Sequence, residues 1–160
     1  MRNRWYATMP LESRPMSRFY DIDAANAAIP ELDGIVGILR EQRAELVRLR
    51  DEVLAAGSGG ATSPTPVTAP TATGEAQSPN DLRLIRLRMQ GLIDQMAAGV
   101  ARIDALGLTL RDIERGLVDF PALVSGRQVW LCWRHGDSSI GWWHDLEAGF
   151  DGRRPLAELA

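Results

Sequence analysis

Two stretches of the chain place apolar residues at alternating intervals of three and four, and the segment between them cannot form a helix. The first stretch runs from about Asp23 to Ala56 and the second from about Asn80 to Leu106. The segment Gly57 to Pro79 is rich in Gly, Ser, Thr and Pro, which is typical of a disordered loop. Apolar residues spaced in this way form a seam along one side of a helix. The sequence therefore predicts a long antiparallel two-helix coiled-coil hairpin over residues 19–106, with a disordered loop at residues 57–79.

The predicted helices have recognisable ends. Asp21 or Asp23 can cap the first helix by accepting backbone N–H bonds, and Asn80 or Asp81 can do the same for the second. Gly107 follows the second seam, where a left-handed residue commonly ends a helix.

The apolar stripe is wider than one seam requires. The residues that widen it are Ile29, Val36, Ile38, Ile93 and Val100. Two helices cannot cover so wide a stripe, so we expect it to meet the C-terminal module, a second copy or another protein. A homodimer through the helical hairpin is the favoured expectation, because closed dimers are the commonest oligomers.

After the second helix the apolar period changes to two residues. Four strands are predicted, at Thr109–Ile113, Leu117–Val124, Arg127–Trp133 and Ile140–Asp145. Pro121 is expected at a sheet edge or at a break in its strand, because proline cannot donate to a ladder. Residues 107–160 should thus form a small antiparallel four-stranded β-sheet, which gives an α+β protein.

Composition limits the partners and the compartment. The net charge of −3 gives no general attraction to nucleic acid or to an anionic membrane. The chain contains no Lys, which excludes Schiff-base chemistry and a Lys-based phosphate cradle. Cys132 is the single cysteine and cannot form an internal disulfide, which favours a reducing compartment. Residues 1–18 carry four Arg without a following apolar run, so they are predicted to be a flexible tail rather than a signal peptide. We therefore expect a cytoplasmic protein with neither a nucleic-acid nor a membrane partner.

Several short motifs together resemble a known family. They are the stretch from Ala24 to Leu32, the stretch from Gly116 to Pro121, the triplet Leu131-Cys132-Trp133 and the triplet Trp143-His144-Asp145. In these motifs the chain resembles a bacterial family catalogued as domain of unknown function 2203. That family has no established activity, so the resemblance implies neither a reaction nor a cofactor.

Some polar residues of the sheet module could carry chemistry. They are Asp119, Cys132, His135, His144, Asp145, Arg153 and Arg154. A thiol, an imidazole and a carboxylate can form a nucleophile, base and orienter set, or bind a metal with one open position. However, Cys132 and His144 lie on separate strands without a paired ligand motif. Placing Trp133 opposite Ile140 joins the apolar sets of the last two strands, and this register puts Cys132 and His144 on opposite faces.

The other polar residues also have structural explanations. Asp119 is expected to accept backbone hydrogen bonds that hold a turn. Arg153 and Arg154 are expected to pair with Asp145, Glu147 or Asp151, although they could also grip an anionic ligand. The Arg residues near the loop end of the hairpin alternate with acidic residues, which is typical of a solvated helix face.

Three functions remain open at this point. The leading hypothesis is a non-enzymatic, self-associating interaction or scaffold protein without a cofactor. A third and weaker one, which only the family resemblance implies, is a division-associated adaptor. The expected ligand or partner surface consists of Asp119, Trp133, Trp143, His144 and Arg153. The alternative is a small metal- or ligand-binding protein or enzyme that uses Asp119, Cys132 and His144, with Cys132 and His144 as the candidate metal ligands.

Overall fold

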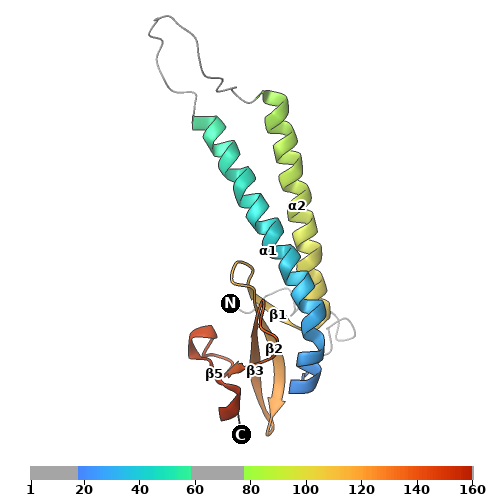
Figure 1. Cartoon of the computed structure of the whole chain (residues 1–160), viewed down its shortest axis with the longest axis vertical. Helices are drawn as coiled ribbons and strands as arrows, with labels where there is room; N and C mark the ends of the chain where they lie inside the picture. Colours follow the sequence, from blue (N-terminus) through green and yellow to red (C-terminus); the bar gives the residue numbers. More distant parts are fainter. Residues whose placement is uncertain (1–17, 59–77, 160) are drawn as a thin grey trace, which may run out of the picture. The chain divides into compact units, whose positions relative to one another are not determined.

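Two helices followed by an antiparallel sheet make up the protein (Figure 1). The computed structural model describes residues 18–58 and 78–159. The predicted α+β class is therefore confirmed, with five strands in place of four. Apart from Arg18, the predicted tail lies outside the described residues, and so does most of the predicted loop. The ends of that loop were misplaced, because helix α1 continues to Ser58 and helix α2 already begins at Pro79.

Helix α1 spans Ile22–Ser58 and helix α2 spans Pro79–Ala105. The Asp21 carboxylate accepts the N–H of Ala24 at 2.7 Å, so Asp21 is the cap of α1. The cap of α2 is Ser78, not Asn80 or Asp81 as predicted. Its hydroxyl accepts the N–H of Asp81 at 3.3 Å, and the Asp81 carboxylate accepts the N–H of Ser78 in return. In the described parts of the chain, no helix is both long and apolar enough to cross a membrane.

Contacts divide the chain into two compact units. Of the described residues, the first unit contains 18–40 and 99–159, and the second contains 41–58 and 78–98. Within each unit the two helices run antiparallel. As the residue number rises along α1, the number of the contacting residue in α2 falls. In the first unit, Glu31 pairs with Arg102 and Leu39 packs against Gly99. In the second, Gln42 bonds Gln95 and Glu45 pairs with Arg88. The coiled-coil geometry of this pair stays a prediction.

The sheet is an antiparallel meander in the order β1-β2-β3-β4-β5. Its strands are β1 Thr109–Asp112, β2 Leu117–Val124, β3 Arg127–Arg134, β4 Trp142–His144 and β5 Arg154–Pro155. The first three strands match their predicted ranges to within one residue. The fourth is shorter than predicted, and β5 was missed because two residues are too few to show a period.

One face of the sheet forms the core of the first unit with the early turns of α1, which lie beside it in Figure 1. The buried sheet residues of this face are Val118, Phe120, Val129, Leu131, Trp133 and Trp143, and the buried helix residues include Leu32, Val36 and Leu39. Polar side chains of α1 secure the loops around them. Asn26 accepts the N–H of Ile140 at 2.8 Å, and Arg40 donates to the carbonyl of Glu114 at 3.0 Å.

Pro121 lies inside β2 without breaking it. Asp119 is the last residue of β2 that pairs with β1. Pro121 therefore has no β1 residue beside it that would need a backbone N–H donor. Its carbonyl instead accepts the backbone N–H of Tyr20 at 2.7 Å. Pro121 therefore lies at a local edge of an inner strand.

The register between β3 and β4 differs from the prediction by one residue. Trp130 lies opposite His144, Leu131 opposite Trp143 and Cys132 opposite Trp142. The prediction extended regular alternation back to Ile140, which lies before β4 and is held by helix α1 instead. Because a one-residue shift exchanges the faces of a strand, Cys132 and His144 share a face and the predicted separation was wrong.

Candidate metal centre

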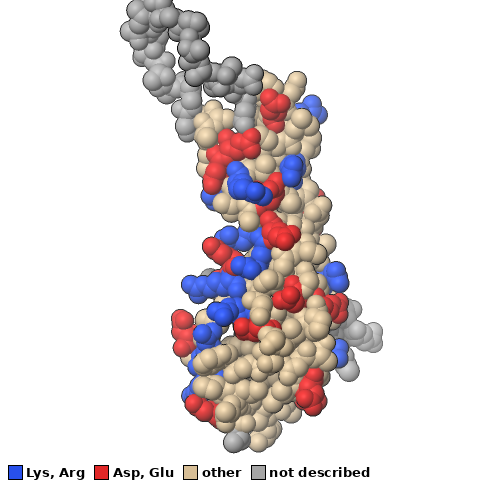
Figure 2. Space-filling model, viewed as in Figure 1, with Lys and Arg blue, Asp and Glu red and all other residues tan. Residues whose placement is uncertain are grey.

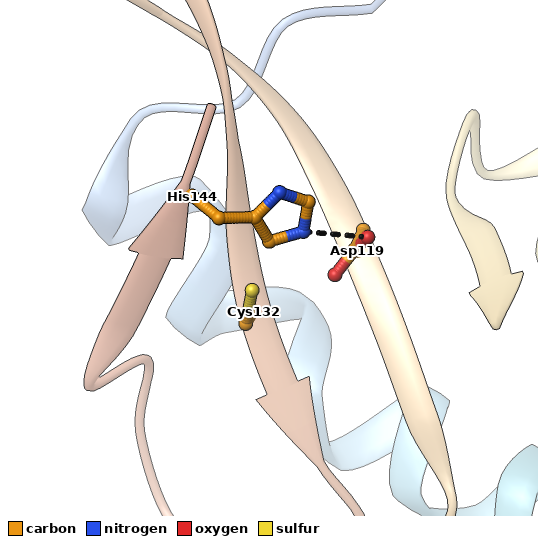
Figure 3. Close-up of side chains that lie close together, drawn as sticks. All are labelled: Asp119, Cys132 and His144. Atoms are coloured by element: carbon orange, nitrogen blue, oxygen red, sulfur yellow. Dashed lines mark hydrogen bonds and ion pairs between the residues drawn. The ribbon is translucent and has the colours of Figure 1, made fainter. Parts of the chain in front are cut away.

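Three polar side chains meet on the sheet face that points away from the helix core. Asp119 comes from β2, Cys132 from β3 and His144 from β4, and Figure 3 shows them pointing toward one another. One ligand atom from each residue, a carboxylate oxygen, the thiol sulfur and an imidazole nitrogen, lies within 4.8 Å of the other two. The residues are 4%, 5% and 2% exposed, respectively. Adjacent strands thus place three different metal-ligating groups at one buried point.

The hydrogen bonds of His144 decide which ring nitrogen faces the cluster. Nδ1 lies 2.7 Å from the backbone carbonyl of Asp145. A carbonyl can only accept, so Nδ1 carries a hydrogen. Nε2 then lies 3.1 Å from Oδ2 of Asp119, which is also an acceptor. Without a cation, a hydrogen must lie between Nε2 and Oδ2, on the imidazole or on the carboxyl group; with a cation in the cluster, Nε2 can offer its lone pair instead.

Arg111 also reaches the Asp119 carboxylate. Its Nε donates to Oδ2 at 2.6 Å, and its guanidinium stacks 5.0 Å from the ring centroid of Trp130. Arg111 lies at a β-bulge, where the β1–β2 register slips between Leu110 and Asp112. Bulges commonly re-aim a side chain in this way. The sequence analysis missed Arg111; the available signal was a lone Arg within a short strand that pairs with the strand carrying Asp119.

The Cys132 thiol is unsuited to act as a nucleophile in this arrangement. Burial raises the pKa of Cys132 far above its ordinary value, the neighbouring Asp119 carboxylate raises it further, and the guanidiniums of Arg153 and Arg111 oppose this only in part. The thiol is therefore protonated near neutral pH. Both ring nitrogens of His144 already face oxygen atoms, so the imidazole is not aligned as a base on the sulfur.

The same geometry fits a metal ion. Bonds of about 2.0–2.3 Å to a tetrahedral zinc ion place ligand atoms roughly 3.3–3.8 Å apart. The Nε2–Oδ2 separation of 3.1 Å is already close to that range, and the sulfur lies within 4.8 Å of both atoms. Metal-ligating histidines usually donate their other ring N–H to a carbonyl or carboxylate, as His144 does. A bound divalent ion would also hold the thiol as a thiolate, which reverses the effect of burial.

The side chains of three other candidate residues, His135, Asp145 and Arg154, pair with residues outside this cluster. His135 lies beside α1, where Nδ1 is 3.1 Å from Arg40 and Nε2 is 3.6 Å from Asp33. The side chain of Asp145 pairs with Arg127 at 3.2 Å and Arg154 at 3.8 Å. Arg154 therefore forms the predicted salt bridge. Asp119 does not hold a turn as expected, because it lies inside β2 and its carboxylate bonds the side chains of Arg111 and His144.

The Trp residues divide between the two faces of the sheet. Trp133 and Trp143 are buried in the core. They cannot contact a partner, so including them in the predicted partner surface was wrong. The register places Trp130 and Trp142 on the face of the metal-ligating cluster, where both are partly exposed. Sequence alternation alone could not assign these faces, because adjacent Trp residues at 142 and 143 satisfy either register.

The Arg-rich helix faces of the second unit are ion-paired. Glu45 pairs with Arg48 and Arg88, and Arg50 pairs with Asp51 at 2.7 Å. Figure 2 shows basic and acidic side chains interleaved along the helices. These ion pairs agree with the predicted solvated, ion-paired helix face.

The fold and the cluster together define an α+β protein with a buried Asp–Cys–His set on the outer face of an antiparallel meander. The chain belongs to the uncharacterised conserved protein family DUF2203, whose family model matches residues 18–156. The match contains both helices and all three residues of the set. Neither a curated protein nor a solved structure matches the chain.

Proposed function

We propose that this chain is a metal-binding protein that holds one divalent transition-metal ion between Asp119, Cys132 and His144. The observation that carries the proposal is the meeting of an oxygen, a sulfur and a nitrogen ligand within 4.8 Å at a buried point. Mixed donors of this kind suit zinc, a borderline-soft ion that accepts Cys, His and carboxylate ligands. Sequence reasoning placed this function second, because the register that it favoured kept Cys132 and His144 apart.

The ligand count suggests what the ion does. Among the described residues, the cluster contributes three metal-ligating side chains and no fourth. Structural zinc sites generally have four protein ligands, whereas sites with three leave a position for water or substrate. The proposed role is therefore binding of a ligand at an open coordination position, not the stapling of the fold.

The test is metal analysis of the purified protein and of protein stripped with a chelator and then reloaded with Zn²⁺. One equivalent of zinc is expected for the wild type. Cys132→Ser and His144→Gln should lose it while the far-UV circular dichroism spectrum stays unchanged. The matched controls are His135→Gln and Asp145→Asn, which alter the same residue types outside the cluster and should retain the metal. A folded wild-type protein that takes up no zinc, cobalt or iron would refute the proposal.

Self-association through the helices is a second candidate, and exposed leucines favour it. In α2, Leu84 and Leu87 are 64% and 61% exposed and lie three residues apart, so they form one apolar ridge. Burying a leucine side chain contributes about 1.5–3 kcal/mol. Sedimentation velocity should therefore show at least about a tenfold weaker dimer for the double variant Leu84→Gln/Leu87→Gln. The control Arg86→Gln should dimerise like the wild type, and a wild type that stays monomeric at high concentration would exclude this function.

A further inference from the structure

Arg153 lies near the cluster, and its guanidinium has no anionic partner among the residues that the structure describes. Its guanidinium stacks 3.9 Å from the ring centroid of Phe150 and 4.9 Å from that of Trp142. Trp142 is the strand partner of Cys132, so this stack covers the sulfur side of the cluster. Within residues 18–58 and 78–159, no carboxylate forms an ion pair with Arg153, whereas neighbouring Arg154 pairs with Asp145.

Arg111 occupies the corresponding position on the other side. It stacks on Trp130, which is the strand partner of His144. Arg111 uses Nε to donate to Asp119, and no ion pair or hydrogen bond of its two terminal nitrogens is recorded in the described part of the chain. Each guanidinium lies over an indole ring and retains N–H donors for a ligand. Two Trp-supported guanidiniums therefore flank the proposed metal position.

Charge indicates the class of ligand. With a divalent ion bound, the Asp119 carboxylate and the Cys132 thiolate balance the two charges of the ion, and His144 is neutral. The charges of Arg111 and Arg153 are then left without counter-charge on this face. A dianion would balance them, and guanidinium groups bind phosphate through paired N–H donors.

We propose that the open coordination position takes a phosphate dianion, as inorganic phosphate or the phosphoryl group of a monoester, held between the metal ion and the guanidiniums of Arg153 and Arg111. This inference rests on the proposed metal-binding function. It assigns Arg153 as an anion-binding residue and Arg111 as a residue that both orients Asp119 and contacts the ligand.

The experiment is isothermal titration of the zinc-loaded protein with inorganic phosphate, phenyl phosphate, dimethyl phosphate and acetate. Elemental analysis of each sample reports its metal content. The dianionic phosphates should bind, and Arg153→Ala should weaken them by about 10- to 100-fold, which corresponds to the loss of charge-assisted hydrogen bonds. Arg153→Lys should recover part of the affinity. Arg154→Ala is the matched control and should bind phosphate like the wild type.

The outcomes separate this inference from the proposed function. If one zinc ion binds but phosphate affinity is the same for wild type and Arg153→Ala, the inference is overturned and the metal site stands. Acetate binding as tightly as phosphate, or an equal loss in Arg154→Ala, also overturns it. If no metal binds, the proposed function fails, and phosphate binding that depends on Arg153 would then support the anion assignment alone. Tighter binding of phenyl phosphate than of inorganic phosphate would identify a monoester as the ligand.

Discussion

The hydrogen bonds of Asp119 allow a quantitative prediction for the metal-free protein. Asp119→Asn keeps the shape of the side chain and one acceptor oxygen, and removes the negative charge. The buried Asp119 oxygen accepts from His144 at 3.1 Å and from Arg111 at 2.6 Å. A hydrogen bond to a charged group contributes about 1.5–3 kcal/mol and a neutral one about 1 kcal/mol. The His144 bond should thus lose about 1–2 kcal/mol.

The contribution of Arg111 is smaller, because its side chain is 42% exposed and solvent screens the pair to below about 1 kcal/mol. The total expected loss in the free energy of unfolding is therefore about 1–3 kcal/mol. The assay is urea denaturation in the presence of a chelator, followed by tryptophan fluorescence, since Trp130, Trp133, Trp142 and Trp143 all lie in the sheet.

The control for this prediction is Asp145→Asn, whose ion pairs with Arg127 and Arg154 involve side chains that are more than half exposed on the Arg side. It should change stability by less than about 0.5–1 kcal/mol. If Asp119→Asn is as stable as Asp145→Asn, or more stable than the wild type, then His144 does not donate to a carboxylate. The protonation argument for the cluster would then be wrong.

Three further predictions concern the Cys132 thiol and the turn at Gly116. Because burial raises the pKa of the Cys132 thiol, the metal-free native protein keeps a proton that the unfolded chain loses above about pH 8.5, so its stability should fall as pH rises beyond that value. Zinc must displace at least this proton, so zinc affinity measured by competition with a chelator should rise by at least roughly tenfold per pH unit near neutrality, and a pH-independent affinity would exclude thiolate ligation. Gly116→Ala should lose about 2–5 kcal/mol in urea denaturation, because Gly116 has φ +67° and an added Cβ would lie 2.5 Å from Cβ of His135. Gly126 has a similar φ of +77°, but an added Cβ there would meet open space. Gly126→Ala should therefore lose only the backbone part of that free energy. Equal losses for the two variants would contradict the packing argument.

The metal centre and the exposed ridge of α2 suggest different roles for the two units. The first unit contains every residue of the cluster, and the second contains Leu84 and Leu87. The two proposals therefore depend on separate residues, and variants of one should leave the other unchanged. Metal analysis of the Leu84→Gln/Leu87→Gln variant and sedimentation of Cys132→Ser would show whether metal binding and self-association are independent.

Features that depend on local sequence were predictable from the sequence alone. The two helices follow from apolar residues that recur every three or four positions, and strand β2 was predicted with its observed bounds, Leu117–Val124. Gly107 ends its helix region with φ +75°, as its position after the second seam indicated. Each of these signals involves residues within a few positions of one another, because helical and strand periods are properties of a short segment.

The site depends on contacts between distant segments, and only the tertiary structure decided it. A one-residue change in the pairing of β3 with β4 determines whether His144 faces Cys132 or the helix core, and the apolar pattern of the adjacent Trp142 and Trp143 fits either choice. The bulge that directs Arg111 to Asp119 has no local signature of its own. The sequence thus determined which metal-ligating groups the sheet carries, and the long-range register determined that three of them meet.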